Sequence, residues 1–151
     1  METNSFYHEI LMEHNLHPAH KHPLPAANIV LDGVNPSCGD SIRLLLQIQA
    51  DSITDAAFIG EGCAVSQASA DILCDLIVGK KKEEALALAN GFLRMIRGEA
   101  QPNETAALGE AEVLRDVCHM PARVKCAVLG WRTLQKALQD STCTHNKRQL
   151  P

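Results

Sequence analysis

Three short apolar segments follow one another closely in the first half of the chain, and this spacing constrains the fold more than any other feature. They span residues 26–35, 41–49 and 53–60, and turn-forming residues such as Asn35-Pro36-Ser37 and Asp51-Ser52 separate them. Two parallel strands need a crossover of about a dozen residues or more, which these connections cannot supply. The sequence therefore predicts a three-stranded antiparallel sheet in meander order.

Helical patterns occupy most of the remaining chain. Residues 1–15 have helical spacing, and Pro18, Pro23 and Pro25 then favour an extended connection. After residue 62, helical spacing continues over 63–78, 81–97 and 121–138, with a polar loop at 98–105 and a shorter helix near 109–118. We expect one α+β domain over residues 1–151, with the helices packed on one face of the sheet. Residues 139–151 lack periodicity and are expected to form a frayed tail.

Composition narrows the classes of partner. The formal charge is −4 and no basic patch is visible, which disfavours nucleic acid. No apolar run approaches the roughly 18 residues that cross a membrane, and the first residues lack the features of a signal peptide. We therefore expect a cytoplasmic protein. In that compartment its six cysteines favour metal binding or thiol chemistry over structural disulfides.

Two of these cysteines lie where reactive groups are favoured. Cys38 and Asp40 flank Gly39 in the tight connection between the first two strands, although an ordinary turn with an incidental thiol is the alternative. Cys63 stands at the start of a helix, where backbone N–H groups and the helix dipole stabilise a thiolate. For Cys63 the alternative is a buried apolar side chain.

Cys126 lies in the last helix, and its spacing alone favours a place in the core. Arg123 is three residues earlier and therefore a neighbour on the helix surface, where a cation could serve a thiolate. With Cys38, Asp40 and Cys63, Cys126 could complete a tetrahedral Zn²⁺ site of net negative charge, which Arg123 would partly offset. No C-x-x-C pair is present, so spacing alone does not assemble this site.

The other candidate ligands are weaker. Cys74 lies on the same helix as Cys63 but about 16 Å further along, too far to share a metal. Cys118 is expected in the core, and Cys143 with His145 in the tail suggests adventitious metal binding at most. The cluster of His17, His20 and His22 lacks an obvious acidic partner, so solvated histidines are the favoured interpretation. Phosphate-loop, G-x-S-x-G, H-E-x-x-H and G-x-G-x-x-G motifs are absent.

Three motifs carry a resemblance to a known family. In chain order they are Asn35-Pro36-Ser37-Cys38-Gly39-Asp40, Gly60-Glu61-Gly62-Cys63 and Pro121-Ala122-Arg123-Val124-Lys125-Cys126. Together they resemble the U-type iron–sulfur cluster assembly proteins, over residues 5–138. Within that family the chain looks more like the SufU branch than IscU, because Lys125 stands where IscU proteins typically have a histidine. The polar stretch at 98–119 also looks like the insertion that distinguishes SufU.

The resemblance implies a function and a set of roles. Cys38, Asp40, Cys63 and Cys126 would hold Zn²⁺, and Cys38 would accept persulfide sulfur from a pyridoxal-phosphate cysteine desulfurase of the SufS type. In the family's mechanism a desulfurase histidine takes a place on the zinc and releases Cys38 as a nucleophile. We expect Arg123, beside Cys126 on the helix surface, to assist activation of the partner. Downstream iron–sulfur assembly proteins would then receive the sulfur.

Two alternatives remain open. The same cysteines could carry a transient Fe–S cluster on a scaffold, or the zinc could be purely structural. Enzyme status stays open too. At most the chain is a zinc-dependent sulfurtransferase that acts with a desulfurase.

Overall fold

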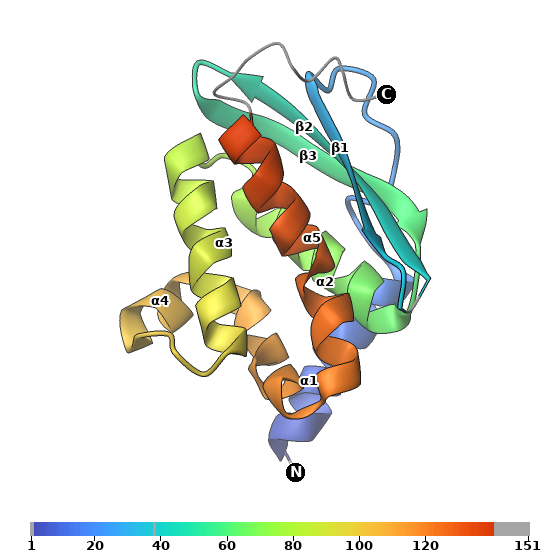
Figure 1. Cartoon of the computed structure of the whole chain (residues 1–151), viewed down its shortest axis with the longest axis vertical. Helices are drawn as coiled ribbons and strands as arrows, with labels where there is room; N and C mark the ends of the chain where they lie inside the picture. The colour runs from blue at the N-terminus through green and yellow to red at the C-terminus, as the bar shows by residue number, and fades with distance from the viewer. Residues whose placement is uncertain (1, 38, 141–151) are drawn as a thin grey trace.

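The computed structural model describes residues 2–37 and 39–140, and its elements follow the predicted order (Figure 1). They are α1 (Glu2–Leu16), β1 (Ile29–Asn35), β2 (Asp40–Gln49), β3 (Ser52–Glu61), α2 (Ala64–Ile77), α3 (Lys82–Ile96), α4 (Pro102–Ala107), the 3₁₀ helix η1 (Gly109–His119) and α5 (Pro121–Asp140). The predicted α+β class is confirmed. The part of the expected tail from residue 141 onward lies outside the described residues.

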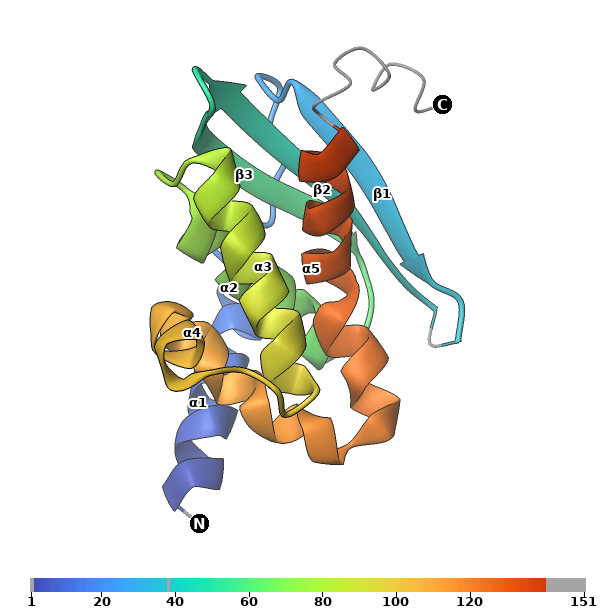
Figure 2. The same cartoon turned by 60° about the vertical axis from the view of Figure 1, so that its left-hand side comes forward.

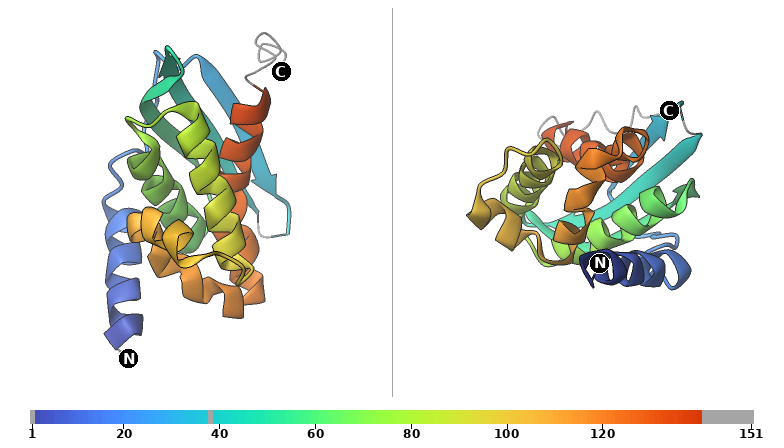
Figure 3. Two further views of the ribbon diagram at one scale, coloured as in Figure 1. Left: turned by 90° about the vertical axis from the view of Figure 1, so that its left-hand side faces the viewer. Right: turned by 90° about the horizontal axis from the view of Figure 1, so that it is seen from below.

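The three strands form one antiparallel sheet in the order β1-β2-β3, as the short connections predict. Along β2, Ile42, Leu44 and Leu46 are buried on one face, whereas Arg43 on the other face is exposed and pairs with Asp32. Helices α2, α3 and α5 lie on the buried face, and α1 extends past the end of the sheet beside α2 (Figures 2 and 3). The predicted packing of helices on one sheet face is thus confirmed.

One predicted loop contains a helix. The polar stretch at 98–105 includes the start of α4, whose first residue is Pro102. Gln101 and Glu104 form a capping box there, and proline at the first helical position suits a helix start. A helix of one and a half turns is too short for apolar periodicity, so the pattern in the sequence could not reveal it.

The helical layer is tied together around Trp131 on α5. Its ring stacks on Phe92 of α3, with ring centroids 4.0 Å apart. Its indole N–H donates to Ser69 Oγ on α2 at 2.9 Å, and the Ser69 hydroxyl donates to the backbone oxygen of Ala127 at 2.7 Å. These buried contacts fix α2, α3 and α5 relative to one another, and α2 and α5 carry two of the candidate ligands.

The connection from α1 to the sheet covers the outer edge of β3. Phe58 N donates to the backbone oxygen of His20, and Lys21 forms a bridge with Phe58. The His20 ring contacts the backbone oxygen of Ala56 at 3.2 Å and Asp75 Oδ1 at 3.3 Å. The interpretation of His20 as a solvated residue without an acidic partner is therefore wrong, because the chain folds back against α2. His17 and His22 are exposed, as expected.

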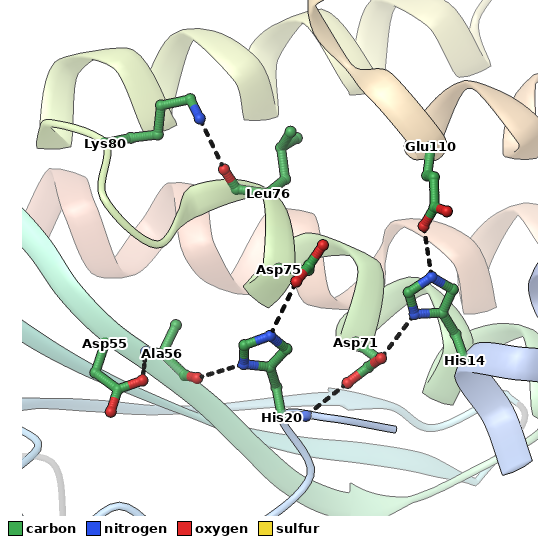
Figure 4. Close-up of polar contacts among 9 residues, drawn as sticks. All are labelled: His14, His20, Asp55, Ala56, Asp71, Asp75, Leu76, Lys80 and Glu110. Carbon is green, nitrogen blue, oxygen red and sulfur yellow. Dashed lines mark hydrogen bonds and ion pairs between the residues drawn. The ribbon is translucent and has the colours of Figure 1, made fainter. Parts of the chain in front are cut away.

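A buried carboxylate on α2 holds this N-terminal region in place (Figure 4). Asp71 is 1% exposed, and its oxygens contact His14 Nδ1 at 2.7 Å and the backbone N of His20 at 2.8 Å. His14 Nε2 also contacts Glu110 of η1 at 2.7 Å. Both ring nitrogens thus face carboxylates, an arrangement that suits the doubly protonated imidazolium. Burial alone would lower the His14 pKa, but the hydrogen bonds to Asp71 and Glu110 and their charges outweigh it and raise it.

This contact predicts a pH-dependent contribution to stability. Because the His14 pKa is raised on folding, the contribution is complete below the unfolded value of about 6.5 and is lost as pH rises through the folded pKa. We expect His14→Gln to lower the free energy of unfolding by about 2 kcal/mol at pH 6 and by less at pH 8. Urea unfolding at both pH values measures this. The exposed His22→Gln is the control, and an equal loss at both pH values would contradict the prediction.

Within the described residues, none of the helices combines the length and the apolar character that crossing a membrane requires.

Candidate metal centre

Three of the four predicted ligands meet in space. Asp40 begins β2, Cys63 is the N-cap of α2, and Cys126 lies in the second turn of α5. One ligand atom from each lies within 4.8 Å of the other two, and no second group of this kind occurs in the described part of the chain. The β1–β2 turn and the first half of α5 lie at the same end of the molecule, at the lower right of Figure 2.

Asp40 is 0% exposed, which is unusual for a carboxylate. Its Oδ1 accepts a hydrogen bond from Cys63 N at 3.0 Å, which ties the start of β2 to the start of α2. Its Oδ2 is buried without a hydrogen-bond partner. An unpaired buried charged oxygen costs about 1–3 kcal/mol or more, and a cation at this position would remove that cost.

Cys63 is half-buried at the N-terminus of α2, as the sequence predicts. The backbone N–H of Ser66 donates to its sulfur over 3.4 Å. Unpaired N–H groups of the first helical turn and the helix dipole both favour negative charge on this sulfur. The Cys63 sulfur therefore lies at the helix start that the sequence predicts, within the group of three candidate ligands.

Cys126 is 3% exposed and closes the site from the side of α5. Its Sγ lies 3.9 Å from the backbone oxygen of Ala122, one turn earlier. Arg123 and Lys125 are exposed on the same turns, so the basic side chains stand at the surface beside the centre. Spacing placed Cys126 in the core, and the structure shows that it is both a core residue and a candidate ligand.

The described cysteines Cys74 and Cys118 do not belong to the group of three. Cys74 is fully buried, and burial, together with the charges of Asp71, Asp55 and Asp75, raises the pKa of its thiol well above the usual range. Cys118 is half-buried, so its expected place in the core is wrong, because it lies at the C-terminal end of η1 and lines a surface pocket. Cys38, Cys143 and His145 lie outside the described residues.

Close packing at Gly62 supports the ligand arrangement. A Cβ at Gly62 would approach Asp40 Oδ1 and Ser66 Oγ closer than van der Waals contact allows. Gly62→Ala should therefore displace Asp40 and weaken Zn²⁺ binding by about tenfold or more, as competition with a chromophoric chelator would measure. Gly91→Ala is the control, because its Cβ would meet only Glu104 at 3.6 Å. Equal zinc affinity in both variants would contradict the prediction.

Sequence reasoning missed two buried polar residues next to candidate ligands in the hairpin and in α2. Asn35 is paired directly with Asp40 across the β1–β2 hairpin, and Gln67 follows Cys63 by one turn of α2. Asn35 Nδ2 and Gln67 Oε1 are both buried without a hydrogen-bond partner. The sequence did contain a signal for Gln67, because this polar residue lies one helical turn after the candidate ligand Cys63 in a largely apolar helix.

Comparison with known proteins defines the class. Residues 6–94 match the family model of the NifU-like N terminal domain, and the chain belongs to this family. It is 41% identical over 140 residues to the iron–sulfur cluster assembly scaffold protein IscU of Streptococcus pyogenes, covering 93% of this chain and 87% of that one. It is 39% identical over 135 residues to the zinc-dependent sulfurtransferase SufU of Bacillus subtilis, covering 89% and 90%.

Solved structures agree with this assignment. A protein from Fervidobacterium islandicum assigned as an iron–sulfur cluster assembly scaffold for the SUF system superposes with a TM-score of 0.81 at 37% identity. The match covers 86% of this chain and 94% of that chain. The resemblance drawn from the three motifs is therefore confirmed at the level of family and fold.

Proposed function

We propose that this protein is a zinc-dependent sulfur acceptor for iron–sulfur cluster assembly, which takes persulfide sulfur on Cys38 from a SufS-type cysteine desulfurase. One observation carries the proposal. Asp40, Cys63 and Cys126 converge within 4.8 Å, and the buried Asp40 carboxylate keeps one oxygen unpaired. Cys38 precedes Asp40 by two residues and supplies the thiol that such chemistry needs.

The residues present fit zinc. Two thiols and a carboxylate are ligand types that Zn²⁺ binds, and Cys38 would supply the fourth ligand of a tetrahedral site. Bound there, Zn²⁺ would keep the thiols deprotonated at neutral pH. Oxygen and sulfur donors from β2, α2 and α5 would then hold the metal between the sheet and the helices.

The chain's own residues would perform the transfer. The Cys38 thiolate attacks the terminal sulfur of the desulfurase persulfide, so that a new S–S bond forms on Cys38 while the desulfurase cysteine leaves as a thiolate. Cys63 N–H donates to Asp40 Oδ1 and so holds this ligand, and the N-terminus of α2 faces the same centre. Arg123, exposed one turn before Cys126, would meet the partner at the rim.

The comparisons support both sulfur transfer and an alternative. The name of the Bacillus subtilis relative describes a zinc-dependent sulfurtransferase, whereas that of the Streptococcus pyogenes relative describes a scaffold for cluster assembly. Lys125 before the last cysteine and the carboxylate of Asp40 favour zinc over a cluster ligated by histidine. The same proposal implies that downstream iron–sulfur assembly proteins take the sulfur from Cys38.

Metal analysis of freshly purified protein, paired with a visible absorption spectrum, tests the proposal. We expect about one zinc per chain, no charge-transfer colour, and persulfide transfer from a purified pyridoxal-phosphate desulfurase only in the zinc-loaded form. Iron with sulfide and brown absorption would instead support the scaffold. Bound zinc without any acceptance of sulfur would indicate that the metal has a purely structural role.

Arg123 offers a test of the surface beside the site. Arg123→Ala removes this exposed cation and should weaken stimulation of the desulfurase by roughly tenfold, which corresponds to about 1.4 kcal/mol. The zinc content should stay unchanged. Arg132→Ala is a matched control, because Arg132 is an exposed arginine on the same helix but two turns further along. If Arg123→Ala and Arg132→Ala behave alike in a desulfurase assay, Arg123 has no special role.

A further inference from the structure

Three side-chain polar atoms in the described part of the chain are buried without a hydrogen-bond partner, and each belongs to a candidate ligand, to the residue opposite one in the hairpin or to a residue one turn after one. They are Asp40 Oδ2, Asn35 Nδ2 and Gln67 Oε1. Buried polar groups are almost always paired, so such groups concentrated in one place point to contacts that form only when something is bound. Among the three, Asn35 Nδ2 is the only donor, and a donor suits anionic metal ligands.

The β1–β2 pairing places Asn35 beside Asp40. The two residues are directly opposite at the end of the hairpin, so their Cβ atoms are about 4.5–5.5 Å apart on the same face. Both side chains are buried, at 7% and 0% exposure. The backbone oxygen of Asn35 also accepts a hydrogen bond from Gly39 N at 3.0 Å, which closes the turn that contains Cys38.

The packing of β1 on α5 places the same pair beside Cys126. Two residues before Asn35 on the same face, Gly33 lies directly against Leu129 and Thr133 of α5. Asp40 carries a carboxylate oxygen within 4.8 Å of the Cys126 sulfur, so the Asn35–Asp40 pair lies one turn further toward the start of that helix. Asn35, opposite Asp40 on this face, therefore lies next to the group of three candidate ligands.

We propose that Asn35 is a positioning residue of the metal centre, whose side-chain amide donates hydrogen bonds to the anionic ligands, with Asp40 Oδ2 as the first acceptor. This inference rests on the proposed metal site. Groups that hydrogen-bond to metal ligands fix the orientation of those ligands, and a neutral donor does so without adding charge to a buried site. Asn35 thus lies behind the ligands, does not ligate the metal, and has its full complement of partners only in the metal-bound protein.

Asn35→Leu separates this role from a structural one. Leucine has the same number and branching of side-chain heavy atoms as asparagine and removes a buried donor that is unpaired in this structure, so the metal-free variant should melt at or above the temperature of the wild type. Its Zn²⁺ affinity, measured by chelator competition, should fall about 10- to 100-fold. In the Co²⁺-substituted protein the thiolate-to-cobalt and d–d bands should shift. Asn35→Asp, which adds a negative charge at the same position, should lower zinc affinity at least as much.

Asn28→Ala is the matched control at the other end of the same hairpin. The Asn28 side chain pairs with both backbone groups of Ile48, away from the ligands. This variant should melt at a lower temperature and keep the zinc affinity and cobalt spectrum of the wild type. Wild-type affinity and spectrum in Asn35→Leu and Asn35→Asp would overturn the role of Asn35 alone. A wild-type protein that binds no zinc would instead overturn the proposed function together with it.

Discussion

Cys38→Ala should reduce sulfur acceptance to background while the fold survives. The proposed role makes Cys38 the nucleophile, so the new S–S bond should form on its sulfur. Asp40, Cys63 and Cys126 remain in this variant, so the metal should be retained with lower affinity. Mass spectrometry of the chain after reaction with a persulfide-loaded desulfurase, under non-reducing conditions, measures the transferred sulfur.

Two features make this result decisive. The described cysteines outside the centre are poor substitutes, because Cys74 is fully buried and Cys118 does not approach the three ligands. Circular dichroism and melting of the variant then separate loss of the acceptor from loss of the fold. Persulfide that still appears on Cys63 or Cys126 at the wild-type rate would refute the assignment of Cys38.

Cys63→Ser should empty the metal site. Serine keeps the shape of the α2 N-cap but offers a hydroxyl, which is a far weaker zinc ligand than a thiolate. Zinc content should fall from about one per chain to near zero after dialysis. When free zinc is at 1,000 times the dissociation constant, its binding adds about 4 kcal/mol to the free energy of unfolding of the wild type. In the presence of zinc, the variant should therefore melt about 10 °C below the wild type.

Cys118→Ser is the control for this experiment. Cys118 is also half-buried and also carries a thiol, but it stands outside the group of three ligands. It should keep both the zinc and the melting temperature of the wild type in zinc. If Cys63→Ser retained stoichiometric zinc, the ligand set proposed here would be wrong, whatever the result with Cys38.

The periodic elements were predictable because each carries its own signal. The three strands and five of the helices, η1 included, follow from apolar spacing and from short connections that allow only antiparallel pairing. The predictions that failed did so for local physical reasons. α4 is too short to show a period, and His20 is held by Asp71 and Asp75 from a helix that lies more than fifty residues further along the chain.

The centre could be predicted only in part. Cys63 was predictable because it stands at a helix start. It lies 23 positions after Asp40, however, and nothing in the spacing to Cys126 shows that the three residues meet. That step came from the resemblance to a family, and the geometry now supports it independently for three of the four ligands. The role of Asn35 depends on which buried atoms remain unpaired, and no sequence pattern carries that information.

The chain contains a single tryptophan, and its position makes it an internal reporter of how α5 packs on the other helices. Trp131 follows Cys126 by five residues on α5 and is fully enclosed between Phe92 and Ser69. Any displacement of α5 from α2 and α3 would expose the indole to water and shift its emission to longer wavelength. Intrinsic fluorescence can therefore test, without any label, whether loading of the site changes the packing of α5.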